Sequence, residues 1–292
     1  MSKSIYLFCE GSTNSPDIAI LQSIPFNNPV IIQPLGGKGG YKRFAEGFLV
    51  QPKSLGTSFD YFVLRDRDFD HPVPERAELW IEERNKAHLT THRITIENYL
   101  LTPEHFWNFL TSRNTPNIPE TIKNLYPTLD SVRILFREAA RTIAYFQAAR
   151  HALGAIRVIA DQKTNFIKSN NTGKVQFHDS GTLPEQLDRA ACNNAAHKVI
   201  NWYHDEISGY TTEQFDVRYE QFVRQFTTPE FLETDQHLIC FNGKDIQKAL
   251  TQINSDLSSF PFSTFYRYTL ENFDYSKFPD FVQLKAIIDR VQ

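Results

Sequence analysis

The sequence predicts an α/β protein with a mostly parallel β-sheet, helices on both faces of that sheet, and a largely helical C-terminal region. Short apolar runs alternate with helical patterns up to about residue 102, which is typical of a parallel sheet. Beyond residue 102 the helical periodicity dominates. The chain has 292 residues, enough for one large or two ordinary domains. We therefore expect one domain over residues 1–102 and a mainly helical region over 103–292.

Four apolar runs are the expected strands of the sheet. They cover residues 5–9, 30–33, 61–64 and 90–94. A helix is expected to begin at Pro16 or Asp17, because proline suits the first helical turn. Two more helical patterns cover residues 44–49 and 75–86. Ligands of parallel sheets bind outside the carboxyl ends of the strands, so residues that directly follow a strand are the first functional candidates.

The region after residue 102 carries a series of helical patterns. They cover residues 103–111, 129–159, 183–207, 213–226 and 281–291, and one more begins at Ile246. The apolar run 238–241 has the composition of a strand and is a candidate for a strand that returns to the sheet. We expect this region to supply contacts to substrate and partner.

Composition excludes several classes of protein. No apolar run approaches the roughly 20 residues of a membrane span, and the N-terminal run is too short for a secretion signal. Three widely spaced cysteines favour neither a disulfide framework nor a zinc site. We expect a cytoplasmic protein that does not enter a membrane. The net charge of -3 means that any contact with nucleic acid must come from a local basic patch.

Acidic residues follow two of the expected strands. Glu10 comes directly after the first strand, and Asp66 and Asp68 follow the third. If the two strands are parallel neighbours, these carboxylates meet at one edge and raise each other's pKa values unless a cation lies between them. Carboxylate oxygens are the ligands of Mg²⁺, which can activate water against a phosphodiester. Ordinary loop acids are the alternative, but two acidic groups at matched strand ends favour the metal site.

The order of these motifs resembles the Toprim domain, a Rossmann-like fold shared by topoisomerases, bacterial primases, RecR-type repair proteins and OLD (overcoming lysogenization defect) nucleases. The resemblance covers residues 1 to about 102 and is carried by Glu10-Gly11 and Asp66-Arg67-Asp68. The flanking segments 36–38, 65–69 and 96–100 are similar to a stand-alone, OLD-like group. In size and layout the chain is most similar to the nuclease subunit of the two-gene PARIS anti-phage system.

This resemblance implies a centre that holds Mg²⁺ or Mn²⁺. Glu10 matches the Toprim glutamate, a metal ligand that also acts as a general base or acid. Asp66 and Asp68 match the Asp-x-Asp ligands, and Glu97 is similar in position to a later acidic ligand of OLD-type nucleases. Asp17 is the candidate for an acid one helical turn beyond the glutamate, although the loop before it is longer than the usual spacing.

The resemblance also implies a late lysine that neutralises phosphate charge, and Lys244 and Lys38 are the candidates. Lys38 lies in the glycine-rich run 36–40, which lacks the spacing and the Lys-Ser/Thr pair of a phosphate loop. Nucleotide binding by this chain is therefore not expected. The run is either a turn whose amides approach a nucleic-acid phosphate or a plain strand–helix connection.

A basic stretch in the second half is the candidate nucleic-acid interface. Between residues 131 and 168 there are seven basic residues against two acidic ones. Arg133, Arg137 and Arg141 are spaced to share one helix face. A solvated helix face is the equally weighted alternative.

These observations predict a metal-dependent endonuclease that cleaves RNA such as tRNA, or DNA. The resemblance implies a toxic effector of anti-phage defence, controlled by an ABC- or OLD-type ATPase partner, and a homodimer is compatible with it. The alternative is a non-catalytic nucleic-acid or protein-binding module of the RecR type, but such a module does not need a repulsive acid cluster. A phosphatase of the Asp-x-Asp type is disfavoured because its nucleophile follows the first strand.

Overall fold

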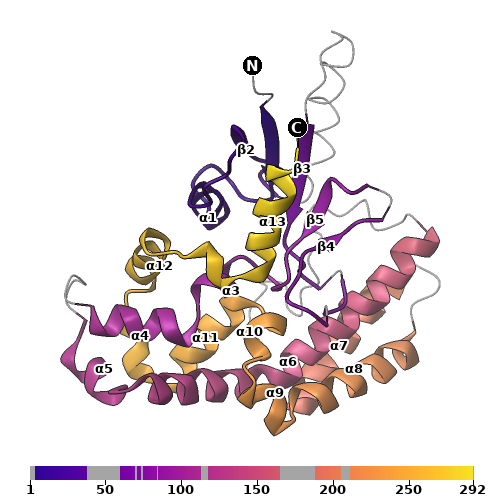
Figure 1. The fold of residues 1–292 in the computed structure, drawn as a ribbon. Helices are drawn as coiled ribbons and strands as arrows, with labels where there is room; N and C mark the ends of the chain where they lie inside the picture. Colours follow the sequence, from indigo (N-terminus) through magenta and orange to yellow (C-terminus); the bar gives the residue numbers. More distant parts are fainter. Residues whose placement is uncertain are drawn as a thin grey trace. The chain divides into compact units, whose positions relative to one another are not determined.

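The computed structural model (Figure 1) describes eight segments of the chain. They are residues 4–37, 60–69, 71–73, 75–83, 85–112, 118–164, 188–204 and 211–291. The chain divides into two compact units. The sheet unit comprises Met1–Arg67, Val73–Ile96 and Thr269–Gln292, and the helical unit comprises Asp68–Pro72 and Glu97–Tyr268. The division expected after residue 102 stays a prediction, and the compact units group the C-terminal segment with the N-terminal one.

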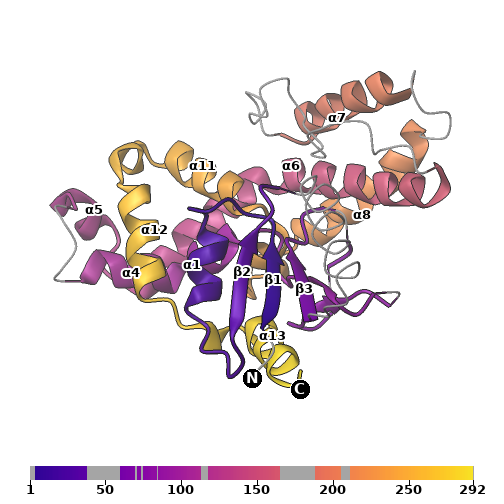
Figure 2. The ribbon, with the colours of Figure 1, turned by 90° about the horizontal axis from the view of Figure 1, so that it is seen from above.

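The sheet unit contains a five-stranded, mostly parallel sheet with the order β2-β1-β3-β5-β4. Its strands are β1 (Ile5–Cys9), β2 (Val30–Pro34), β3 (Asp60–Arg65), β4 (Trp80–Ile81) and β5 (His88–Thr90). Strand β1 is parallel to both β2 and β3, as Figure 2 shows, β3 is parallel to β5, and only β4 runs antiparallel. The α/β class and the first three strands are thus confirmed.

Burial explains why β1 is an almost unbroken apolar run. Ile5, Leu7, Phe8 and Cys9 are all at most 1% exposed, as expected of a strand covered on both faces. Helix α1 (Pro16–Gln22) begins at the predicted proline and buries Ile20 and Leu21.

The C-terminal helix α13 (Pro279–Asp289) is tied to the sheet unit by side-chain hydrogen bonds. The N–H of Leu79 donates to Oε1 of Gln283 over 2.7 Å, and the N–H of Asn27 donates to Oδ1 of Asp289, also over 2.7 Å. Figure 1 shows α13 in yellow beside the sheet. The sheet unit is therefore built from both ends of the chain.

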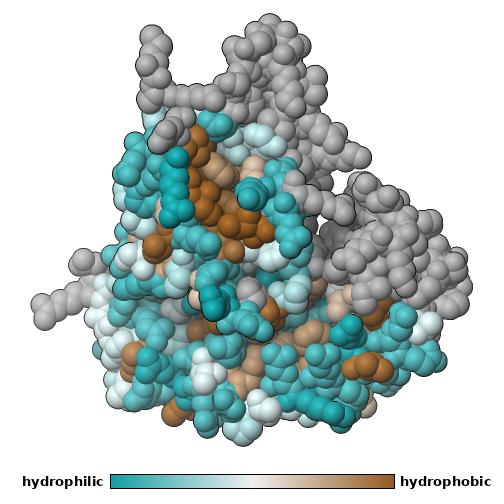
Figure 3. Space-filling model, turned by 45° about the vertical axis from the view of Figure 1, so that its right-hand side comes forward, coloured by the Kyte–Doolittle hydropathy of each residue, from teal (hydrophilic) through white to brown (hydrophobic). Residues whose placement is uncertain are grey.

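The helical unit is organised around α6 (Leu129–Thr164), a helix of 36 residues. The other helices are α3 (Glu97–Leu100), α4 (Pro103–Thr111), α5 (Glu120–Leu125), α7 (Arg189–His204), α8 (Thr212–Phe226), α9 (Pro229–Glu233), α10 (His237–Cys240), α11 (Gly243–Ile253) and α12 (Phe262–Glu271). Helix α6 packs against α4, α7, α8, α9 and α11. On the face drawn in Figure 3, hydrophilic side chains cover most of the helical part. Among the described helices, none combines the length and the apolar character needed to cross a membrane.

Two predictions at the end of the sheet are wrong. The run 90–94 is not a strand, because β5 ends at Thr90 and the residues after it form bends. The N–H of His92 donates to Oδ2 of Asp280, and its carbonyl accepts from Nε of Arg67, so side chains take the groups that a neighbouring strand would need. The described part of 75–86 is not a helix, because Glu82 bonds to His88 in the antiparallel pairing of β4 with β5.

The predicted strand over 238–241 is also wrong. Residues 237–240 form helix α10, because the N–H groups of Leu238 and Cys240 bond to the nearby carbonyls of Asp235 and Gln236. The helix expected over 44–49 lies outside the described residues.

Candidate metal centre

Glu10 and Asp66 lie at the carboxyl-end rim of the sheet. Strands β1 and β3 are parallel neighbours with Cys9 opposite Leu64, so the residues that follow them leave the sheet at the same edge. The Asp66 carboxylate is held there, because its Oδ2 accepts a hydrogen bond from the N–H of Ile96 over 3.3 Å. The structure thus brings this predicted pair to one edge of the sheet unit.

Asp17 joins that rim because the loop after Glu10 folds back. A Cβ atom on Gly11 would lie 1.8 Å from Ser15 Oγ and 2.7 Å from Asp17 Oδ2. These distances show that the Asp17 carboxylate rests against the backbone of Gly11, and that only glycine leaves room for it. The longer loop therefore does not carry Asp17 away from the glutamate.

A second glycine turn packs against the same backbone. The N–H of Gly36 donates to the carbonyl of Gly11 over 3.0 Å, and the N–H of Gly37 donates to the carbonyl of Glu10 over 2.6 Å. Gly36 and Gly37 have φ values of 70° and 116°, which side chains disfavour. The glycine-rich turn therefore fixes the residue after β1. Lys38 lies outside the described residues.

The three carboxylates act on one thiol. Burial raises the pKa of Cys9 to about 12, and the negative charges of Asp17, Asp66 and Glu10 add to that rise. A shared effect on a single buried group means that the three acids make one region of negative potential at the end of β1. Such a region favours a cation, and its oxygen donors are the kind that Mg²⁺ and Mn²⁺ prefer.

Sequence reasoning missed the residue that braces the Asp-x-Asp segment, Arg67. Its side chain is fully buried, its Nε donates to the carbonyl of His92 over 3.0 Å, and its N–H donates to Thr91 Oγ1 over 3.3 Å. Asp280 of α13 takes the N–H of the same His92 over 3.1 Å. An arginine between two aspartates has the pattern of a solvated loop, so no signal in the sequence marks it as buried.

His92 is neutral in this environment. Burial, followed by the charges of Arg67 and Arg93, lowers its pKa to about 4. It therefore does not offer a positive charge to a phosphate near neutral pH.

In the helical unit the structure joins two residues that were predicted separately. Lys244 Nζ lies 3.0 Å from Glu97 Oε1. The Glu97 side chain is 16% exposed, whereas that of Lys244 is 61% exposed. Lys244 therefore sets a solvent-accessible positive charge directly beside the acid, and a cation that binds Glu97 must share its carboxylate with the ammonium group.

The amide of Asn98 holds this pair in place. Asn98 is fully buried, its Nδ2 donates to the carbonyls of Leu238 and Phe241 over 2.9 and 2.7 Å, and its Oδ1 accepts from the N–H of Gly243 over 3.0 Å. A Cβ on Gly243 would lie 3.0 Å from the Cβ of Glu97, so glycine permits the close approach of α3 and α11. Sequence reasoning also missed Asn98, because an asparagine after an acid carries no distinctive pattern.

Asp68 belongs to the helical unit, although it is only two residues beyond Asp66. Its φ of 46° lies in the left-handed region, which aspartate adopts more readily than most residues. Phe69, the next residue, is buried against α6.

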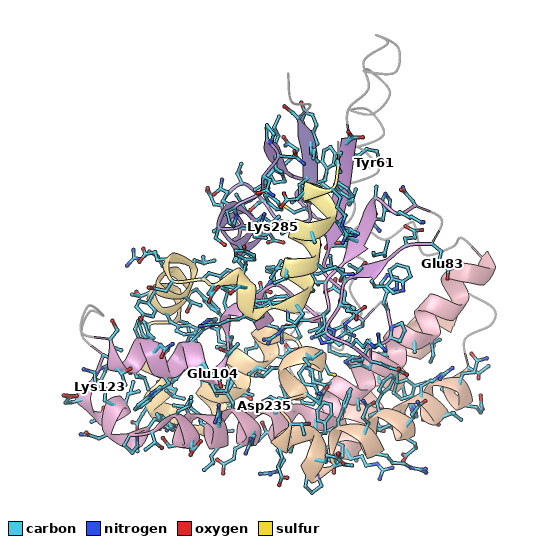
Figure 4. The ribbon with its side chains drawn as sticks, viewed as in Figure 1. Tyr61, Glu83, Glu104, Lys123, Asp235 and Lys285 are labelled. Atoms are coloured by element: carbon cyan, nitrogen blue, oxygen red, sulfur yellow. The ribbon has the colours of Figure 1, made fainter. Side chains whose placement is uncertain are left out.

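The three arginines proposed as a nucleic-acid interface differ in their surroundings. Arg133 pairs with Glu104 over 2.9 Å, and Arg137 pairs with Asp235 over 3.5 Å; Figure 4 labels both acids. Arg141 is exposed. Two of the three charges are thus already partly neutralised, which weakens a stripe of positive potential along α6, and binding to nucleic acid stays a prediction.

The carboxylates at the rim do not form a complete metal-binding site by themselves. Among the described residues, no three His, Cys, Asp or Glu side chains converge closely enough to hold an ion as they stand. The chemistry of the donors nevertheless fits a hard divalent cation, because they are carboxylates that follow neighbouring strand ends and Mg²⁺ commonly keeps several waters in place of protein ligands.

Comparison with known proteins leaves the family open. No family model matches the chain, and no curated protein is significantly similar to it. The Toprim resemblance is therefore carried by the motifs of the sequence.

Proposed function

We propose that this protein is a metal-dependent endonuclease that cleaves phosphodiester bonds in RNA such as tRNA, or in DNA. One observation carries the proposal: Glu10 and Asp66 follow neighbouring parallel strands and leave the sheet at the same edge, and the Asp17 carboxylate lies against Gly11, next to Glu10. Rims of this kind are where open α/β sheets bind their ligands.

The roles of the individual residues follow from their surroundings. Glu10 and Asp66 would hold Mg²⁺ or Mn²⁺, with Asp17 beside them and Asp68 as the second acid of the Asp-x-Asp segment. When bound, the metal would polarise the phosphodiester and lower the pKa of a bound water. Glu10, in its carboxylate form, can accept the proton of the attacking water at a side-chain oxygen.

Lys244 contributes a positive charge that the acids lack. Its side chain is 61% exposed, and a lysine ammonium on a flexible stem can exchange Glu97 for a phosphate oxygen of a substrate. Glu97 then has two roles. It pairs with the ammonium group of Lys244 in the absence of substrate, and it is the candidate for the acidic ligand that follows the Asp-x-Asp motif in the sequence.

The resemblance to PARIS-type nucleases supports a wider proposal. The chain would be a cytoplasmic, toxic effector of anti-phage defence whose cutting is controlled by an ABC- or OLD-type ATPase partner. A homodimer is part of the same proposal.

The experiment that tests the proposed function measures metal binding and cutting together. The protein is titrated with Mn²⁺ by calorimetry and incubated with plasmid, single-stranded DNA and total tRNA in Mg²⁺ or Mn²⁺. Glu10→Ala and Asp66→Ala should abolish both binding and cutting. Asp60→Asn is the matched control, because Asp60 begins strand β3 at its opposite end and should leave both unchanged.

Two outcomes of this experiment contradict the proposal, and a third supports its metal site without showing cutting. Cutting that survives both alanine variants would show that the site is elsewhere. Nucleic-acid binding without Mn²⁺ binding or cutting would favour the RecR-type module. Mn²⁺ binding that is lost in both variants, without cutting by the isolated protein, supports the site and moves the question of activity to the partner ATPase.

A further inference from the structure

Arg150, near the middle of α6, contacts two segments that carry proposed site residues. Its guanidinium lies over the ring of Phe69, with 4.3 Å between the Cζ atom and the ring centroid, and 5.7 Å from the ring of Phe146. It also forms an ion pair with Asp245. Phe69 directly follows Asp68, and Asp245 directly follows Lys244. One side chain therefore touches the neighbours of both residues within the helical unit.

The Phe69 side of this arrangement is tightly packed. A Cβ on Gly154 would lie 2.2 Å from the carbonyl oxygen of Phe69 and 2.7 Å from its Cβ, so the turn rests directly on the backbone of α6. The ring of His151 meets the Phe69 ring edge-on at 4.9 Å. Asp68 has a left-handed backbone, a conformation that persists only where the surroundings hold it. The contacts of Phe69 with α6 supply that restraint.

The Asp245 side is equally well defined. Gln147 Nε2 donates to Asp245 Oδ2 over 2.9 Å, and Gln147 Oε1 accepts from the N–H of Asn242 over 3.1 Å. Asn242 in turn caps α11 by accepting the N–H of Lys244 over 3.0 Å. The first turn of α11, which presents Lys244, is thus fixed to α6 by Gln147 and Arg150.

The chemistry of Arg150 explains why arginine stands at this position. The side chains of Arg150 and Asp245 are only 13% and 7% exposed, so the pair is largely removed from water. Apolar residues can often replace such a pair without loss of stability, so its presence indicates a geometric role. A planar guanidinium can stack on Phe69 and bond to Asp245 at once, whereas the ammonium of a lysine cannot do both.

We propose that Arg150 is a positioning residue for the metal-dependent reaction, holding the turn that presents Asp68 and the helix end that presents Lys244 in register with each other. This inference rests on the proposed nuclease function. The basic charge of Arg150, which the sequence alone would assign to a nucleic-acid surface, is already used inside the fold by Asp245 and Phe69.

Two variants separate positioning from simple stability. Arg150→Lys keeps the charge beside Asp245 and loses the stacking on Phe69. The double variant Arg150→Met/Asp245→Asn removes both charges, keeps a similar volume, and tests the proposal if the lysine variant fails to fold. Arg224→Lys is the matched control, because Arg224 is an exposed arginine of α8 in the same unit and has no proposed role in binding.

The readouts are the Mn²⁺ affinity of the folded protein, the Mg²⁺ concentration that gives half-maximal cutting, and the melting temperature. Both Arg150 variants should need about 10-fold more metal by either measure, as is typical when a residue behind a metal ligand is changed. Excess Mg²⁺ should restore cutting by Arg150→Lys, and Arg224→Lys should match the wild type. A residue that only stabilises the fold would change the melting temperature and leave both metal concentrations unaltered.

The outcomes also separate this inference from the function on which it rests. A wild type that binds Mn²⁺ and cuts, together with Arg150 variants of unchanged metal dependence, would overturn the inference alone. A wild type that neither binds Mn²⁺ nor cuts would overturn both.

Discussion

Replacing Gly11 by alanine should disturb the acidic rim, which is formed by Glu10, Asp17 and Asp66 at the carboxyl ends of β1 and β3. The new Cβ would lie 1.8 Å from Ser15 Oγ and 2.8 Å from Ser15 Cβ. Rotation of the serine side chain relieves the first contact, but the second requires the backbone of the loop to move. Overpacking of this kind costs about 1–3 kcal/mol. Because Asp17 Oδ2 lies 2.7 Å from the same point, the movement should also displace that carboxylate.

Urea unfolding and Mn²⁺ calorimetry on the same samples measure both effects. The control is the double variant Gly11→Ala/Ser15→Gly, which removes the serine atoms that clash. The Ser15 side chain makes no capping hydrogen bond to α1, so Ser15→Gly alone should cost only a few tenths of a kcal/mol, roughly the penalty for a glycine cap. The double variant should therefore be more stable than Gly11→Ala. If the two substitutions are additive in unfolding free energy, the packing argument is refuted.

Two further predictions concern buried residues that are not proposed metal ligands. Asn98→Asp should lower the free energy of unfolding by about 2–4 kcal/mol and weaken the Glu97–Lys244 pair, because a carboxylate cannot donate to the two buried carbonyls that Asn98 bonds. Urea unfolding measures this, with Asn108→Asp, an exposed change on α4, as the control. If the two variants are equally stable, the prediction is contradicted. The pKa of His92 is lowered to about 4 in the folded protein, whereas in the unfolded chain it is about 6.5. Between these pH values the unfolded chain binds a proton at His92 that the folded protein does not. The free energy of unfolding should therefore drop by about 2 kcal/mol as the pH falls from 7 to 5. His92→Gln should lose that part of the pH dependence, and a variant with the same slope as the wild type would exclude His92 as its source.

The sequence predicted best where one local signal controls the structure. Strand β1 is a continuous apolar run and was predicted residue for residue, and α4 begins at Pro103 as expected. Helix α6 begins at the predicted Leu129 and continues to Thr164, beyond the expected end. These elements follow from burial and from the restricted backbone of proline, which are properties of short segments.

The errors arose where distant side chains decide the backbone. The run after Thr90 has strand-like composition, but Arg67 and Asp280 take the peptide groups of His92. For the candidate site, the sequence identified the acids at the strand ends because they follow apolar runs. It could not identify Arg67, Asn98 or Arg150, whose roles depend on contacts with residues far away in the chain.

The discontinuous sheet unit has a consequence for how the protein is made. Its β-strands lie in the first 90 residues, yet helix α13, which bonds to Asn27, Leu79 and His92, is synthesised about 190 residues later. A ribosome releases β1, β2 and β3 long before the helix that completes their unit exists. The acidic rim is therefore held by its full set of supports only after translation has passed Asp289, so a truncated chain from an interrupted message would carry Glu10, Asp17 and Asp66 without the helix that completes their unit.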